Sequence, residues 1–390
     1  MNVGYVWRIH NRCYNKYRCN SIVRAATFVL TTTSVFQSTT HCFPIHNKYQ
    51  NSSQRMSSKL VDVDCNLQHD DLIQLSQQST TSIKNNDDVP DCFQLLYHPS
   101  IQHANIGAMI VPSSTILESQ SMQSLLSQLT SNTINGMEVK TTVGVHPYHA
   151  QEEDTLQQVS VLKELLSQPS NICAIGECGL DYSPGFPDKS YQYPWFQQQV
   201  QLAIQYQLPL FIHERLAFHD LLQVLDSNNN DGLPPIIIHC FTGTVEECRE
   251  YIARGYSISI SGFILKKGSE EVQQCLRDGI IPLHKLMVET DAPYMGFPSC
   301  RDTYNQYEDL SQLNSKQRKR IQKSIYPNVP TSLPQVLHAI LDLLNQGRMQ
   351  NKEQQPLLTY EQLATITSQN AKQFFNLDLT IDTTTTNKEE

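Results

Sequence analysis

Features that mark several common protein classes are missing from this sequence. Its eleven cysteines include no Cys-x-x-Cys pair, and no apolar run is long enough to span a membrane. Isolated cysteines in or beside predicted strands, such as Cys65 and Cys240, behave as small apolar residues. We therefore expect a reduced, intracellular protein without a disulfide framework and without a membrane partner.

Acidic residues are absent from the first 60 positions, which carry eight Lys or Arg. This composition is typical of an organelle transit peptide, so we expect residues 1–58 to be a targeting or disordered extension, with a mitochondrial presequence favoured. The mildly apolar stretch Ala25–Phe36 leaves a plastid or secretory address open. A shorter cytoplasmic form starting at Met56 is a further alternative.

Basic residues are in turn scarce in the rest of the chain, where 61–390 contain 21 basic and 38 acidic residues. Proteins that bind nucleic acid non-specifically usually carry the opposite charge, because neutralisation of phosphates drives their affinity. The charge argues against a large nucleic-acid groove, but it does not exclude a metal site that gathers phosphate locally.

From Lys59 onward, strand-like and helix-like runs alternate. The expected strands are Leu60–Cys65, Ile106–Val111, Val139–Val145, Ile172–Ile175, Leu208–Ile212, Pro235–Ile238, Tyr256–Ser261 and Lys285–Val288. Helical patterns such as Leu156–Leu166 and Val245–Arg254 lie between them, which indicates βα units and a parallel sheet. Eight units predict an α/β fold, a TIM-like (β/α)8 barrel. The rival, a doubly wound open sheet, usually has a Gly-rich phosphate turn, and the sequence has none.

We expect the barrel to occupy residues 59–378 and to end in a disordered tail, 379–390. Polar insertions at about 76–103 and 299–325 interrupt it. The second contains the basic run Lys316–Arg320, for which a solvated helix face and a role in guiding polyanions both stay open. Helices closing the fold are expected at Leu333–Asn345 and Tyr360–Phe375, with Ser332 and Thr359 as their N-caps.

Five expected strands end in residues able to bind a metal. These endings are His146, Glu177, His213, His239 and Glu289-Thr290-Asp291. In a parallel barrel, the carboxyl ends of the strands meet at one face and carry the chemistry. A lone His at such a position is more often structural, and a lone acid more often caps the next helix. Five endings in chain order predict a metal site instead.

The donors of Glu177, His213, His239 and Asp291 suit magnesium, manganese or zinc, and the absence of Cys ligands argues against a closed structural zinc. Glu177 is the natural bridge between two cations. Two neighbouring cations can hold both the attacking water and the leaving oxygen of a phosphodiester. Asp291 could then orient or deprotonate that water.

Seven stretches together resemble the TatD-like metal-dependent deoxyribonucleases, in the order of that family and from Leu60 to Leu377. They are Gly144–Pro147, Ala174–Tyr182, His213–Arg215, His239–Thr244, Glu289–Tyr294, Asn328–Pro330 and Thr367–Ala371. The resemblance implies a TIM-like barrel of the metal-dependent hydrolase type. It also implies hydrolysis of DNA phosphodiester bonds, usually as an exonuclease. The expected substrate is DNA, preferentially single-stranded or with frayed ends. No obligate protein partner is expected.

The same resemblance implies roles for individual residues. It makes Glu177, His213, His239 and Asp291 the ligands of two divalent cations, with Glu177 and Asp291 catalytic. His146 and Arg215 would bind the substrate, facing its phosphate, which the planar fork of an arginine matches well.

The first strand departs from the family pattern. Many members have His-x-His there, whereas this chain has Asp64 and Asn66. It looks closest to a branch that lacks the histidine pair. Asp64 could still bind a cation through oxygen, which would favour magnesium. Alternatively, the second metal is held loosely or arrives with substrate. Asp181 matches the family and is expected to support a ligand or to cap a helix.

Two other functions stay open. A barrel amidohydrolase acting on a small amide or ester often bridges its metals with a carboxylated lysine, but no expected strand ends in lysine, and Glu177 fills that kind of position. A binding scaffold that has lost catalysis would explain the missing histidine pair. Retention of the other four ligands argues against it.

Overall fold

The computed structural model describes residues 58–81, 89–129, 133–152, 155–168, 171–228, 232–350 and 356–379. The predicted targeting extension lies outside these residues except for Ser58, and the predicted tail lies outside them except for Leu379. Among the described helices, none is long and apolar enough to cross a membrane.

The described strands form one sheet in the order β1-β2-β4-β5-β6-β7-β8-β9, in which all neighbours are parallel. The strands are β1 (Leu60–Asp62), β2 (Ile106–Val111), β3 (Thr133–Ile134), β4 (Met137–Val143), β5 (Ile172–Asp181), β6 (Leu210–Arg215), β7 (Ile236–Ile238), β8 (Ser257–Ile260) and β9 (Leu286–Val288). Short β3 pairs antiparallel with β4. The sheet nearly closes, because Val63 N–H donates to Val288 O at 3.3 Å and Asp291 N–H donates to Asp64 O at 2.9 Å. The predicted barrel is confirmed.

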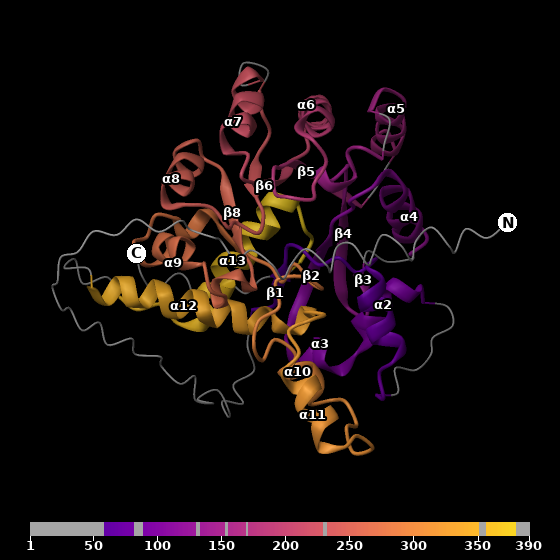
Figure 1. Cartoon of the computed structure of the whole chain (residues 1–390), viewed down its shortest axis with the longest axis vertical. Helices are drawn as coiled ribbons and strands as arrows, with labels where there is room; N and C mark the ends of the chain where they lie inside the picture. The colour runs from indigo at the N-terminus through magenta and orange to yellow at the C-terminus, as the bar shows by residue number, and fades with distance from the viewer. Residues whose placement is uncertain are drawn as a thin grey trace, which may run out of the picture. The chain divides into compact units, whose positions relative to one another are not determined.

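Helices follow most strands and surround the barrel, with α4 to α9 in chain order around it (Figure 1). The helices are α2 (Asp70–Gln77), α3 (Pro99–His103), α4 (Ile116–Ser127), α5 (Thr155–Leu166), α6 (Lys189–Tyr206), α7 (Phe218–Ser227), α8 (Val245–Ala253), α9 (Glu270–Arg277), α10 (Asp302–Asn305), α11 (Ser315–Gln322), α12 (Leu333–Gln350) and α13 (Tyr360–Phe375).

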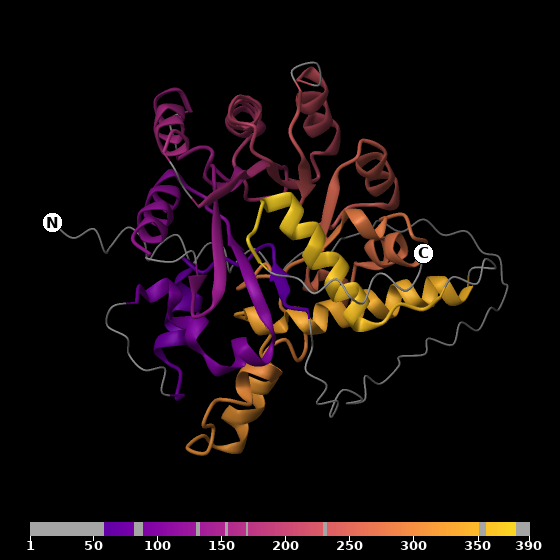
Figure 2. The same ribbon diagram turned by 180° about the vertical axis from the view of Figure 1, so that it is seen from behind.

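The interior of the barrel is a packed apolar cluster, which explains why the strands read as continuous hydrophobic runs. Along β2, for example, Ala108 and Ile110 belong to the inner cluster, while Met109 and Val111 belong to the larger cluster beneath the helices. The end of α13 joins the inner cluster through Phe375, and Figure 2 shows this helix lying across the strands.

The segment after α13 closes the amino end of the barrel. The carboxylate of Glu138, near the start of β4, accepts the backbone N–H groups of Asp378 and Leu379, each at 3.0 Å. Chemistry is therefore left to the opposite end, where the strands finish.

Two caps were predicted for the closing helices, and one is wrong. Thr359 caps α13 in a reciprocal box with Gln362, as expected. Ser332 does not cap α12, because its buried hydroxyl has no hydrogen-bond partner among the described residues. A 3₁₀ turn, Pro330–Ser332, leads straight into this helix instead.

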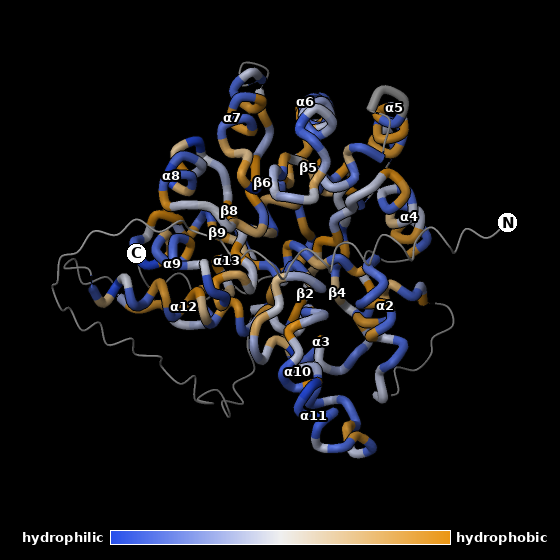
Figure 3. Tube along the Cα trace, in the orientation of Figure 1, coloured by the Kyte–Doolittle hydropathy of each residue, from blue (hydrophilic) through white to orange (hydrophobic). Residues whose placement is uncertain are grey.

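The two insertions are less polar and less separate than we expected. In the first, the 3₁₀ turn Asp91–Tyr97 buries Phe93 and Leu96 in the core. In the second, the carboxylate of Glu308 binds His98 Nε2 at 3.1 Å and the hydroxyl of Thr80 at 2.7 Å. The insertions thus support each other beside the barrel. Figure 3 shows α11, the basic helix of the second insertion, as strongly hydrophilic, and none of its residues is buried.

Candidate metal centre

The predicted site residues converge at the carboxyl ends of the strands. Glu177 and His213 lie in β5 and β6, His239 follows β7 directly, and His146 comes three residues after the end of β4. Asp64 follows β1, and Glu289 and Asp291 follow β9. Two groups of donor atoms lie close enough together to hold a metal ion. They are His146, Glu177 and His213, and Asp64, His239 and Glu289.

Glu177 joins the two groups. Its Oε1 lies 3.2 Å from His146 Nε2, 3.1 Å from His213 Nδ1 and 2.8 Å from His239 Nε2. Burial disfavours the charged carboxylate, but His146 and His239 outweigh this and hold the pKa of Glu177 well below its usual range. Glu177 is thus a charged carboxylate in contact with three imidazoles.

The hydrogen bonds of His146 decide which nitrogen carries its proton. The backbone N–H of Tyr148 donates to Nδ1 at 3.1 Å, so this nitrogen is an unprotonated acceptor. Burial also lowers the pKa of His146, which favours the neutral ring. The proton of that ring is then on Nε2, pointing at Glu177. His146 thus donates a hydrogen bond to Glu177.

His213 has the opposite arrangement. Its Nε2 is hydrogen-bonded to Asp181 Oδ2 at 2.9 Å, which leaves Nδ1 facing Glu177. Although burial opposes the charged ring, Asp181 and Glu177 raise the pKa of His213 to about 9 in the metal-free protein. Such a carboxylate partner commonly fixes the tautomer of a ligating histidine. Asp181 therefore holds the ring of His213, which the sequence predicts to be a metal ligand.

The second group contains buried polar atoms without satisfactory partners. His239 Nδ1 lies 3.0 Å from Asp64 Oδ2 and 3.7 Å from Glu289 Oε1. None of these atoms meets a described group with hydrogen-bond geometry, and the same holds for His239 Nε2. Buried polar atoms are costly when unsatisfied. A divalent cation would satisfy them, so these residues fit the metal that the sequence predicts.

Glu289 was not assigned a role from the sequence. The Glu-Thr-Asp ending was noted, but only Asp291 was chosen as a ligand. In the structure, Asp62 accepts the backbone N–H of Thr290 at 2.8 Å and its hydroxyl at 2.7 Å. Burial raises the pKa of Asp62 to about 8, although the bonds to Thr290 oppose this. Asp62 thus anchors Thr290, the residue between Glu289 and Asp291.

Asp291 and Arg215 lie outside the Glu177 contacts. Asp291 Oδ1 is 3.4 Å from Asn66 Nδ2, and this amide also reaches Asp64 Oδ1 at 3.3 Å. Asp291 is therefore next to Asp64, on the side of the second group. Arg215 is exposed at the end of β6, two residues beyond His213. The structure brings Asp64 and Asp291 together and leaves Arg215 at the rim.

Two glycines that flank Glu177 allow the backbone of β5 to approach β6 closely. Gly176 and Gly179 have φ values of +149° and +140°. An added Cβ at Gly176 would lie 2.3 Å from Phe211 O, and one at Gly179 would lie 1.8 Å from His213 O. The Gly-Glu-Cys-Gly stretch is thus needed for close backbone approach on both sides of Glu177.

We expect Gly179→Ala to lower the free energy of unfolding by about 4 kcal/mol or more, because the backbone of β6 has to move. Urea denaturation measures this. Gly136→Ala is the matched control, since Gly136 also has a positive φ of +76° but nothing lies within 4 Å of an added Cβ. Its cost should stay near 1 kcal/mol. Equal losses for the two variants would contradict the close-approach argument.

A nearly closed parallel barrel that gathers histidines and carboxylates at its strand ends has the architecture of the metal-dependent barrel hydrolases. The family model described as TatD related DNase matches residues 61–376. The chain therefore belongs to the TatD related DNase family, as its motifs predicted.

Individual relatives agree with this assignment. A 3'-5' ssDNA/RNA exonuclease TatD from Shigella flexneri is 34% identical over 193 residues, which cover 49% of this chain and 70% of the relative. The Citrobacter rodentium protein of the same name is 31% identical over 280 residues, covering 71% and 89%. A crystal structure of a TatD homologue from Escherichia coli matches with a TM-score of 0.59 and 20% identity, over 83% of this chain and 100% of that one. This structural likeness shows the shared fold.

Proposed function

We propose that this chain is a metal-dependent exonuclease that hydrolyses phosphodiester bonds of DNA. The observation that carries the proposal is the contact of Glu177 Oε1 with three histidines, all within 3.2 Å, at the end of the barrel where the strands finish. Membership of the TatD related DNase family supports the reaction class. The relatives are named 3'-5' exonucleases of single-stranded DNA and RNA. These names support cleavage from the 3' end and a preference for single strands.

The metal ligands in this proposal are Glu177, His213 Nδ1 and His239, together with the carboxylates near His239. Those carboxylates belong to Asp64, Glu289 and Asp291. The proposed cofactor is magnesium or manganese, with zinc as the alternative. Two ions are proposed because Glu177 lies between His213 and the group around His239 and can bridge two cations. Bound cations would neutralise phosphate charge and make a coordinated water more acidic.

The protein's own groups then have separate tasks. Asp291 orients the attacking water and accepts its proton, as a carboxylate at the edge of the cluster can. His146 donates a hydrogen bond from its Nε2–H to a phosphate oxygen. This agrees with the proton position deduced from its bond to Tyr148. Arg215 reaches the same phosphate from the rim, where its planar fork is exposed. Asp181 keeps the ring of His213 in place.

The proposal is tested by substrate comparison with the metal-reconstituted full chain. Strands of DNA and RNA with identical sequence, a blunt DNA duplex, and a panel of small amides and lactones are offered in parallel. We expect turnover of single-stranded DNA to exceed that of the blunt duplex, with mononucleotides as the product. Turnover of the small amides alone would instead favour the amidohydrolase interpretation.

The exposed basic helix α11 allows a separate prediction about strand binding. If it binds phosphates remote from the site, Lys316→Gln/Arg320→Gln will raise the KM for a 30-nucleotide strand several-fold. The dependence of log affinity on log salt should then flatten by about 0.7 for each phosphate that the variant no longer binds. A trinucleotide should be cleaved as before. The double variant Lys163→Gln/Arg249→Gln removes the same charge from α5 and α8 and is the control. Equal effects of the two double variants would mean that α11 is only a solvated face.

A further inference from the structure

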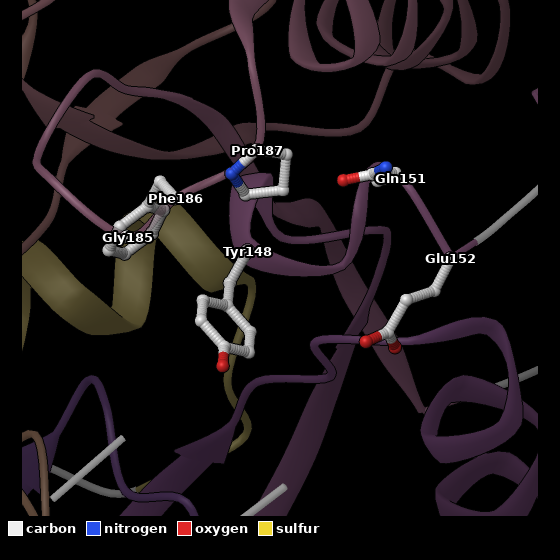
Figure 4. Close-up of a pocket in the computed structure, with 6 residues that line it drawn as sticks. All are labelled: Tyr148, Gln151, Glu152, Gly185, Phe186 and Pro187. Atoms are coloured by element: carbon white, nitrogen blue, oxygen red, sulfur yellow. The ribbon is translucent and has the colours of Figure 1, made fainter. Parts of the chain in front are cut away.

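A hollow of about 220 Å³ opens beside the candidate metal centre. Figure 4 shows that two segments line it, one following His146 and one in the loop after β5. Its lining residues are Tyr148, Gln151, Glu152, Gly185, Phe186 and Pro187. Neither Tyr148 nor Phe186 belongs to the hydrophobic clusters of the described residues, although both are aromatic and half-buried. Core packing therefore does not explain why these rings are there.

The ring of Phe186 lies against the site. Its centroid is 6.3 Å from that of His213, with the two planes 19° apart, and 6.0 Å from that of His146. The ring of Tyr148 meets Phe186 edge to face, with the centroids 5.4 Å apart. Two aromatic walls thus stand at the boundary between the hollow and the donor atoms around Glu177.

Hydrogen bonds connect both walls to site residues. The backbone N–H of Tyr148 donates to His146 Nδ1 at 3.1 Å. In the other loop, the backbone N–H of Ser183 donates to Asp181 Oδ1 at 2.7 Å, and Phe186 N–H donates to Ser183 O at 3.2 Å. The hollow is therefore held at a fixed place relative to His146 and His213.

We propose that this hollow receives one unpaired nucleobase of the substrate strand, next to the phosphate that is hydrolysed. The inference rests on the proposed function and deepens it. Aromatic side chains bind bases by stacking, without regard to sequence. The polar edge of a base would meet the amide of Gln151 and the carboxylate of Glu152, which offer both donors and acceptors. A second phosphate fits less well there because of that carboxylate, which is 3.0 Å from His149 Nδ1.

This assignment supplies a physical reason for action on single strands. A base within a duplex has both faces covered by its neighbours and its edge paired. It can enter the hollow only after unstacking, which costs free energy. Single-stranded or frayed ends avoid that cost, so the same hollow that binds the base also selects the substrate.

The test compares the wild type and three variants on four oligonucleotides, with the metal-reconstituted full chain. The substrates are a single strand and the same strand with an abasic residue placed, in separate oligonucleotides, at each of the last three positions. For the wild type, we expect kcat/KM to fall about tenfold at one of these positions. Phe186→Ala should show a similar fall with the intact strand and no further fall with the abasic one, whereas Phe186→Tyr, which keeps an aromatic ring, should keep the preference for the intact strand.

Tyr206→Ala is the control, because it removes a half-buried aromatic ring from the far end of α6. It should keep the full preference for the intact strand. If Phe186→Ala also keeps that preference at all three positions, the inference is wrong while the nuclease assignment stands.

Binding is measured separately from cleavage, so that failure of the nuclease assignment can be distinguished from failure of the base site. A trinucleotide with 2-aminopurine at the selected position, or at each position in turn if no cleavage occurs, is titrated with metal-free protein. Stacking of 2-aminopurine on Phe186 quenches the fluorescence of the 2-aminopurine. We expect saturable quenching with the wild type and at least tenfold weaker quenching with Phe186→Ala. Quenching without any hydrolysis would retain the base site and overturn the nuclease. Equal quenching by both proteins would overturn the base site.

Discussion

Replacing Glu177 by glutamine is expected to lower kcat/KM for single-stranded DNA by at least about a thousandfold. The change keeps the size of the side chain but removes the charge that contacts His146, His213 and His239. Loss of a group that merely supports a metal ligand typically costs 10–100-fold, so loss of the shared ligand should cost more. Calorimetric titration of the metal-free variant with manganese should show much weaker binding than the wild type.

A buried carboxylate elsewhere in the same barrel is the control for this change. Glu138 is buried at the amino end of β4 and binds the backbone after α13. Glu138→Gln should lower the melting temperature and leave the metal requirement of cleavage unchanged. If Glu177→Gln retains both manganese binding and activity, Glu177 does not hold the metal.

Replacing Asp291 by asparagine is expected to lower kcat by about 10²–10⁴-fold, the usual contribution of a general base. Asparagine can keep the contact with Asn66 but accepts no proton from water. Manganese binding at the Glu177 group should be largely retained, because Asp291 lies on the side of Asp64. The readout is kcat at saturating metal.

Glu289→Gln separates metal binding from proton transfer. Glu289 Oε1 is a buried atom without a hydrogen-bond partner among the described residues, 3.7 Å from His239 Nδ1. Its loss should weaken metal affinity, and high metal concentration should restore much of the rate. If raising the metal concentration rescues Asp291→Asn equally well, Asp291 acts only as a ligand and not also as the base.

The barrel and most of the cluster could be predicted because two simple rules operate together. Apolar runs of strand length separated by helical patterns require a parallel sheet, and parallel strands finish at one end. His146, Glu177, His213 and His239 all end such runs, so their convergence follows from the topology. The extent of β5 could not be predicted in this way. Gly176 and Gly179 look like the end of a strand, but they allow β5 to continue past β6 at close range.

Other features depend on contacts between distant segments, which a pattern along the chain does not encode. The position of Glu289 is fixed through its neighbour Thr290, which Asp62 of β1 binds where the first and last strands meet. The proton position on His146 depends on a single backbone N–H in the turn that follows it. The hollow beside the site is formed by two loops, and only their folding brings Tyr148 to Phe186. Ser332 could not be excluded as a cap without the 3₁₀ turn that contains it.

The measurement that tests the account most directly uses the full chain stripped of metal and a single-stranded DNA labelled at its 5' end. Cleavage is followed without metal and after addition of magnesium or manganese, with Glu177→Gln alongside. The account predicts a metal-dependent ladder that shortens from the 3' end and is absent in the variant. Cleavage that persists without metal, or no cleavage by a folded, metal-loaded protein, would contradict a hydrolytic metal centre built around Glu177.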